Sequence, residues 1–171
     1  GGPFNHSIAG ICVGLGETLT PEFKEYASQT VKNAQFLCSE LQKFNFQLVS
    51  GGTDKHLILI DLTNKSLLGK KFARALDYAG IIANMNTMPQ EKKSPANPSA
   101  LRLGTPWITT RGMKESEMTL IAAWINQVME ICSQWNELEF ADFEKKVKSS
   151  AKIAAIANQV QELCMKFPLK F

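Results

Sequence analysis

The stretch FQLVSGGTDKHLILIDL, residues 46–62, decides the fold class of this 171-residue chain. Its two apolar runs, Phe46–Ser50 and His56–Leu62, have the composition and length of β-strands. The Gly-Gly-Thr-Asp cluster at residues 51–54 separates them, and such a turn-forming cluster favours antiparallel pairing of the strands that it joins. A small sheet is therefore predicted to begin here.

Helical patterns lie on both sides of this strand pair. Thr20 and Pro21 form an N-cap followed by proline at the first helical position, and apolar residues then recur every three or four positions, which predicts a helix over 20–44. The stretch Ile8–Leu19 is apolar and rich in small residues, and we expect a buried helix there. The same periodicity predicts four more helices, over Gly69–Tyr78, Lys114–Trp135, 138–149 and 151–166.

Two short strands complete the predicted sheet, at Ile81–Ala83 and Leu101–Leu103. Between them, Asn84–Ala100 is a polar loop that holds three of the seven prolines, and loops of this length in compact domains are usually functional or disordered. The order of elements predicts an α+β fold, a two-layer sandwich of helices on a small and largely antiparallel sheet.

Composition and charge exclude several classes of protein. Hydrophobic residues make up 44% of the chain and the net charge is only +3. Lys and Arg alternate with Glu and Asp along the helices, so nucleic acid is not an expected partner, and an RNA-binding surface is only a weak alternative. No run of eighteen apolar residues exists, so we expect no membrane span.

Cysteines and histidines do not form a recognisable metal or catalytic motif. Cys12, Cys38, Cys132 and Cys164 are widely spaced without a CxxC pair, and we interpret them as reduced core residues in a reducing compartment. The two histidines have no partner at metal-ligand spacing, so no metal is expected. A GxSxG nucleophile elbow is also absent from the sequence.

Arg102 is the residue with the clearest functional potential. It lies in the middle of the apolar strand LRLGT, where a guanidinium must either emerge at an edge or pair with an anion. One interpretation is a structural salt bridge to a neighbouring carboxylate. The other is a bidentate contact with a ligand carboxylate, and these residues alone leave both open.

Several long blocks of the chain resemble, in order and at matching separations, the C-terminal part of serine hydroxymethyltransferase. The similarity covers nearly the whole chain. The blocks are GGPFNHSIAG (1–10), TPEFKEY (20–26), VSGGTDKHLILIDL (49–62), NMNT (84–87) with KSP downstream, and LRLGTPWITTRG (101–112).

The resemblance implies an enzyme that uses pyridoxal phosphate to interconvert serine plus tetrahydrofolate with glycine plus 5,10-methylenetetrahydrofolate. It assigns Arg102 to the substrate carboxylate and Asn86 to the pterin of the folate. It also assigns Gly1 and Gly2 to the cofactor phosphate of a partner subunit. The enzyme is expected to be a cytoplasmic homodimer or tetramer, with a mitochondrial or plastid form left open.

The resemblance also implies a division of the chain. Residues 1–19 correspond to the end of the large cofactor-binding domain, and residues 20–171 correspond to the small C-terminal domain of an aspartate-aminotransferase-like fold. Subunit contacts would run through the rest of the large domain. Arg111 is expected to be structural, near the start of the helix from 114.

The chain also departs from the family's pattern. Phe4, Lys55 and Met85 replace residues that are often histidine, asparagine and lysine, and the last change puts a charge contact to the folate tail in doubt. The family's Schiff-base lysine lies upstream of the GGP block. We interpret the lysines at 43, 65, 70, 71, 92 and 93 as solvated and not poised as nucleophiles.

The chain alone is therefore expected to be inactive, as a C-terminal fragment of the enzyme. The alternative hypothesis is a binding or regulatory module that kept the fold and lost the catalysis.

Overall fold

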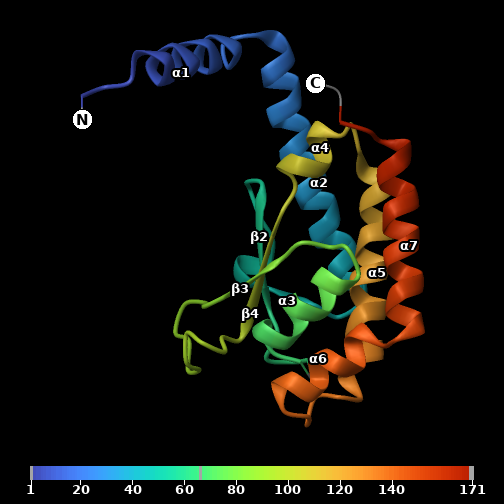
Figure 1. Cartoon of the computed structure of the whole chain (residues 1–171). Coiled ribbons are helices and arrows are strands. Elements are labelled where there is room, and N and C mark those ends of the chain that lie inside the picture. The colour runs from blue at the N-terminus through green and yellow to red at the C-terminus, as the bar shows by residue number, and fades with distance from the viewer. Residues whose placement is uncertain (1, 66, 170–171) are drawn as a thin grey trace.

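The computed structural model describes residues 2–65 and 67–169, and most of its helices pack beside one small sheet (Figure 1). The elements, in chain order, are α1 (Asn5–Glu17), α2 (Pro21–Lys43), β1 (Gln47–Leu48), the 3-10 turn η1 (Val49–Gly51), β2 (Leu57–Asp61), α3 (Gly69–Tyr78), β3 (Asn84–Asn86), β4 (Ala100–Gly104), α4 (Pro106–Thr110), α5 (Glu115–Ser133), α6 (Phe140–Lys148) and α7 (Ala151–Lys166).

The sheet has the strand order β1-β2-β4-β3, and every neighbouring pair is antiparallel. The predicted β1–β2 hairpin is confirmed, with Gln47 opposite Asp61. Its turn contains Ser50 and Gly51 at φ values of 64° and 73°, and the glycine adopts this left-handed conformation without steric cost. Because β2 and β4 are the two inner strands, both are flanked on each side by hydrogen-bonded neighbours.

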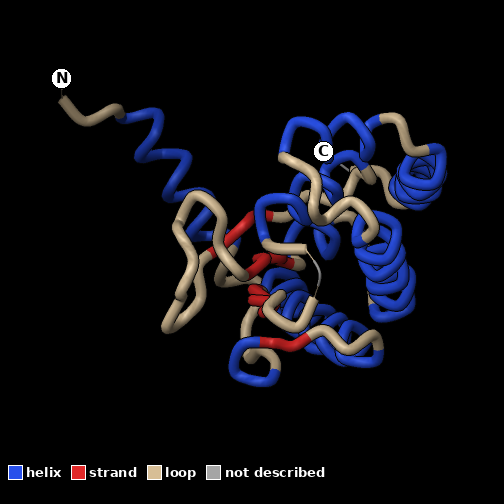
Figure 2. Tube along the Cα trace, turned by 90° about the horizontal axis from the view of Figure 1, so that it is seen from below, coloured by secondary structure: helices blue, strands red, loops and turns tan. Residues whose placement is uncertain are grey.

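The helices of the body cover one face of this sheet, which confirms the predicted two-layer α+β sandwich (Figure 2). Ile58, Ile60 and Leu101 point into the helical layer and are almost fully buried. There they join Leu41 of α2 and Phe72 of α3 in one core. Alternation along the strands then directs the intervening side chains to the other face.

Two of the predicted helices, α2 and α7, begin at side-chain caps. The Thr20 side chain accepts a hydrogen bond from the backbone N–H of Phe23 at 3.2 Å, immediately before Pro21 begins α2. Ser150 caps α7 in the same way, through the N–H of Ile153. Each cap satisfies a donor that the first helical turn leaves unpaired.

Two local predictions need correction. Residues 81–83 are not a strand, because the N–H of Ile81 still bonds to Leu76 at the end of α3; the strand begins later, at Asn84, inside the segment predicted as loop. The short helix α4 was not predicted, although Thr105 followed by Pro106 is the same start signal that opens α2.

The predicted helix near the N-terminus is present as α1, but it is not buried. It has no buried residue and projects from the body (Figures 1 and 2). Ile11 and Leu15 are each 62% exposed. The apolar sequence predicts the helix correctly, but none of the described residues of this chain buries it.

Candidate functional site

The sheet face opposite the helices, which we call the open face, carries the candidate site. Along β2, Ile58 and Ile60 are buried, whereas the open-face residue Leu57 is 38% exposed. Along β4, Leu101 and Leu103 are buried and Arg102 between them is exposed. The open-face residues of the two inner strands and β3 are Leu57, Leu59, Asp61, Asn84, Asn86, Ala100, Arg102 and Gly104.

Arg102 lies at the centre of this face. Its register partners are Leu59 on β2 and Asn84 on β3. Of the two alternatives for Arg102, emergence at a sheet edge does not apply, because β4 is an inner strand. Arg102 reaches solvent through the open face instead, which the strand order and the side-chain alternation together allow.

Arg102 has no side-chain hydrogen bond or salt bridge with any residue in 2–65 or 67–169. The closest acidic position in the register is Asp61, which is diagonal to Arg102 across β2 and β4. Asp61 Oδ1 instead accepts the N–H of Thr63 at 2.8 Å. The described part of the chain therefore provides no internal salt bridge for Arg102, and its planar donor fork is available to an external carboxylate.

Asn86 shares the open face with Arg102. It is the last residue of β3, pairs with Ala100 and is therefore diagonal to Arg102; diagonal neighbours in antiparallel strands are about 7–8 Å apart, and their Cβ atoms are somewhat closer. The Asn86 amide donates to the carbonyl of Thr87 at 2.6 Å, which leaves its own amide oxygen to accept. The structure thus brings two of the predicted site residues within reach of one ligand.

Asn84 was not identified from the sequence as a site residue. It is exposed, lies on the open face and is the direct register partner of Arg102. The alternation Asn-Met-Asn at 84–86 could have revealed it, because residues two apart in a strand share a face. Met85 lies between them and pairs with buried Leu101 on the other side of the sheet.

The predicted phosphate-binding glycines are at the beginning of the sequence. Gly1 lies outside the described residues. Gly2 is exposed and precedes α1, the helix that projects from the body (Figures 1 and 2). A Cβ built on Gly2 would meet no atom within 4 Å, so its backbone is open to a close approach from outside.

A shallow depression adjoins the open face beside β2. It has a volume of about 660 Å³ and is lined by residues 49–54 together with Leu57 and Leu59. Leu59 is also the register partner of Arg102. A ligand whose carboxylate meets Arg102 therefore has apolar surface next to it.

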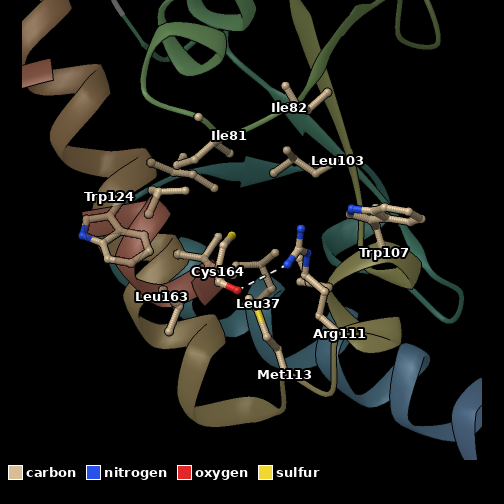
Figure 3. A pocket seen from close by; sticks show the side chains of 16 residues that line it. Leu37, Ile81, Ile82, Leu103, Trp107, Arg111, Met113, Trp124, Leu163 and Cys164 are labelled. Atoms are coloured by element: carbon tan, nitrogen blue, oxygen red, sulfur yellow. Dashed lines mark hydrogen bonds between the residues drawn. The ribbon is translucent and has the colours of Figure 1, made fainter. Parts of the chain in front are cut away.

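A second cavity, of about 590 Å³, lies on the helical side of β4 (Figure 3). Its walls are mostly apolar and include Leu103 and Trp107. Arg111 projects into it, and its Nη1 donates to the carbonyls of Cys164 and Phe167 at 3.3 and 2.9 Å. These bonds tie α4 to the end of α7, so the expected structural role of Arg111 is confirmed.

Two of the lysines that we expected to be solvated are not. Lys65 is half-buried and donates to the carbonyl of Phe44 at 2.8 Å, and burial lowers the pKa of its ammonium. Lys71 donates to the carbonyls of Asn136 and Leu138. Both ammonium groups therefore have structural hydrogen-bond partners.

Cysteines and metal-ligand residues add no further site. Cys38 and Cys132 are buried free thiols, as predicted, but Cys12 is exposed on α1, so the prediction of a core position is wrong for that residue. Within the described ranges, no group of three or more His, Cys, Asp and Glu side chains is placed to hold a metal ion. None of the helices in those ranges is long and apolar enough to cross a membrane.

Comparisons with known proteins agree with the resemblance seen in the sequence. The model of the family described as serine hydroxymethyltransferase matches residues 1–125. A serine hydroxymethyltransferase from Acidothermus cellulolyticus is 48% identical over 168 residues, which are 98% of this chain and 37% of that protein. Another, from Sorangium cellulosum, is 45% identical over 168 residues, 98% of this chain and 36% of that protein. The chain thus spans little more than a third of these curated relatives.

Proposed function

We propose, from the premise that this chain belongs to the serine hydroxymethyltransferase family, that its open face supplies substrate recognition to a longer enzyme. That enzyme uses pyridoxal phosphate to interconvert serine plus tetrahydrofolate with glycine plus 5,10-methylenetetrahydrofolate. This chain is its C-terminal part, with residues 1–19 belonging to the large domain and residues 20–171 forming the small domain. The projecting α1, which has no buried residue, supports this division.

Arg102 binds the α-carboxylate of serine or glycine in this proposal. The observation that carries it is an exposed guanidinium on an inner strand with no acidic partner in the described residues. Two parallel N–H donors fit the two oxygens of a carboxylate, and such a contact fixes orientation as well as adding affinity. Leu59 on one side and Asn84 on the other restrict the positions that the side chain can adopt.

Asn86 binds the pterin ring of the folate. An amide offers both a donor and an acceptor, which suits the edge of a heterocycle. Its place on the face of Arg102 supports the proposal, because the amino acid and the folate must lie close together for a one-carbon unit to pass between them. Met85 makes no charge contact with the folate, because a methionine carries no charge and the register places it on the other side of the sheet.

The open face does not by itself fit pyridoxal phosphate. None of the described strand residues on that face is a lysine, and Lys65 and Lys71 have backbone carbonyl partners elsewhere. Gly1 and Gly2 are proposed to approach the cofactor phosphate of a partner subunit in a homodimer or tetramer. The residues of this chain therefore bind and orient substrates, and the cofactor's own chemistry depends on other parts of the enzyme.

The test is serine kinetics in the full-length enzyme that contains this chain. Arg102→Ala should raise the serine KM by about tenfold or more, because a charge-assisted contact is lost. Arg102→Lys should also impair binding, since a point charge does not replace the planar fork. Arg74→Lys is the matched control, because Arg74 bonds Glu144 and Asp77 on the helical side. Near-normal serine KM and kcat in either Arg102 variant would refute the assignment.

A further inference from the structure

The connection between β3 and β4 runs from residue 87 to residue 99. Within it, the Glu91 carboxylate accepts hydrogen bonds from two other residues of the connection. Glu91 Oε2 accepts the backbone N–H of Ser99 at 2.8 Å, and Oε1 accepts the Ser99 hydroxyl at 2.9 Å. Oε1 also accepts the N–H of Lys93 at 2.8 Å. One half-buried carboxylate thus holds two separated points of the same loop.

Ser99 is in turn anchored to the body of the protein. It is only 2% exposed, and its carbonyl accepts the N–H of Leu62 just after β2 at 3.0 Å. The carbonyl of Pro98 accepts the N–H of Gly69 at the start of α3, also at 3.0 Å. Through Ser99, Glu91 is therefore bonded to a segment that is itself hydrogen-bonded to the body of the protein.

The geometry near Asn86 depends on this contact. Asn86 ends β3 and pairs with Ala100, the residue directly after Ser99. Because Glu91 is bonded to the anchored Ser99, only residues 87–90 lie between Asn86 and the next residue that is held in place, which is Glu91. Without this contact, residues 87–97 would form one unfastened connection between the last pair of the β3–β4 ladder and the anchored Pro98, and a terminal strand pair next to a longer free connection opens more readily.

We propose that Glu91 is a positioning residue: by closing the loop onto Ser99, it holds Asn86 in place for the folate. This rests on the proposed folate contact of Asn86. We name the contact the Glu91–Ser99 clasp. Hydrogen bonds from the Ser99 and Lys93 backbones lower the pKa of Glu91, so at neutral pH the carboxylate is ionised and accepts all three bonds. None of the sequence patterns had marked Glu91.

The first arm of the test is amide hydrogen exchange, measured by NMR on the chain of residues 1–171. Glu91→Gln has one acceptor oxygen and an NH₂ group, so at least one of the three donors loses its best partner. Exchange at Ser99 and Lys93 should rise about tenfold or more. Glu162→Gln, an exposed carboxylate on α7, is the matched control and should leave both rates within about twofold.

The same spectra test whether the effect of Glu91→Gln is confined to the connection between β3 and β4. Amides of Ile58 and Ile60 in β2 should keep their exchange rates in Glu91→Gln. Unchanged exchange rates of the Ser99 and Lys93 amides would show that the Glu91–Ser99 clasp does not hold the loop, and would overturn the proposal. An equal increase in β2 would show that the substitution destabilises the whole sheet, which would also overturn a positioning role.

The second arm is steady-state kinetics in the full-length enzyme. Glu91→Gln should raise the tetrahydrofolate KM and leave the serine KM unchanged, because Arg102 lies on β4 beyond the loop. A released loop with an unchanged folate KM would refute the positioning role. Asn86→Ala tests the folate contact of Asn86 independently of Glu91. If Asn86→Ala leaves the tetrahydrofolate KM unchanged, the proposed function of Asn86 is wrong, whatever the exchange rates measured in Glu91→Gln.

Discussion

Gly69 and Ala100 meet backbone to backbone: a Cβ built on Gly69 would lie 2.4 Å from the carbonyl oxygen of Ala100. Gly69 is the first residue of α3, and Ala100 is the first residue of β4 and the register partner of Asn86. The same Cβ would be 3.0 Å from the carbonyl of Pro98. The helical layer therefore makes a close backbone contact with the sheet at the end of the strand pair that carries the candidate site.

Gly69→Ala should destabilise the protein because the obstacle is backbone and not a flexible side chain. Overpacking of this kind typically costs about 1–3 kcal/mol, and the urea midpoint should fall accordingly. Gly14→Ala is the matched control, because a Cβ at Gly14 in α1 would meet no atom within 4 Å. An unfolding midpoint of Gly69→Ala equal to that of the parent chain would contradict the close contact.

Asn33 joins α2 to the segment that follows β4, and its loss should also be costly. It is fully buried, and its amide donates to Thr109 Oγ1 and to the carbonyl of Met113, both at 2.9 Å. Asn33→Ala should lower the free energy of unfolding by about 1–3 kcal/mol, because buried acceptors lose their donor. Exposed Asn158→Ala on α7 should change it by less than about 0.5 kcal/mol. Equal stability of the two variants would argue against this network.

The elements that sequence reasoning located are those with local signals. Thr20 and Pro21 start α2, and the turn at residues 51–54 joins β1 and β2. β3 was missed because Asn-Met-Asn has little intrinsic preference for a strand; its pairing with β4 makes it one, and that pairing is not encoded locally. Likewise, apolarity predicted α1 as a helix but could not specify the partner that buries it.

The candidate site was predictable only in part for the same reason. The position of Arg102 between Leu101 and Leu103 signalled an unusual arginine. The sequence does not show that Arg102 lies on an inner strand beside Asn84. This position follows from the strand order, which joins segments that are far apart in the sequence. Glu91 gave no signal at all, because its role comes from the fold of the loop around Ser99.

Residues of α1 should be the least protected helical part of the chain. An isolated helix of 13 residues is marginal in water, and α1 has no buried residue. Hydrogen exchange should therefore be faster in α1 than in α2 or β4, and deletion of residues 1–19 should leave the unfolding midpoint of the remainder nearly unchanged. If 5–17 proved the slowest-exchanging segment, α1 would have to pack against the body.

Alkylation rates should separate the four cysteines. Burial raises the pKa of Cys38 to about 11 and that of Cys132 to about 12. Because the thiolate is the reactive form and burial disfavours it, both should stay protonated and unreactive at pH 8. Exposed Cys12 should react first with iodoacetamide, as mass spectrometry of timed samples would show. Cys12→Ser is the control that should remove the fast phase; a second fast phase from Cys38 or Cys132 would contradict their burial.

The chain of residues 1–171, mixed with pyridoxal phosphate, serine and tetrahydrofolate, should form no glycine. In the proposed function Arg102 and Asn86 orient the two substrates, but the ammonium groups of Lys65 and Lys71 are bonded to backbone carbonyls and are not directed to the open face. Free lysine with the cofactor gives the reference absorbance spectrum, and the chain should show no band beyond it. Glycine formation above that of a boiled sample would mean that a lysine of this chain can bind the cofactor productively. The proposal that other parts of the enzyme supply the cofactor-binding lysine would then be wrong.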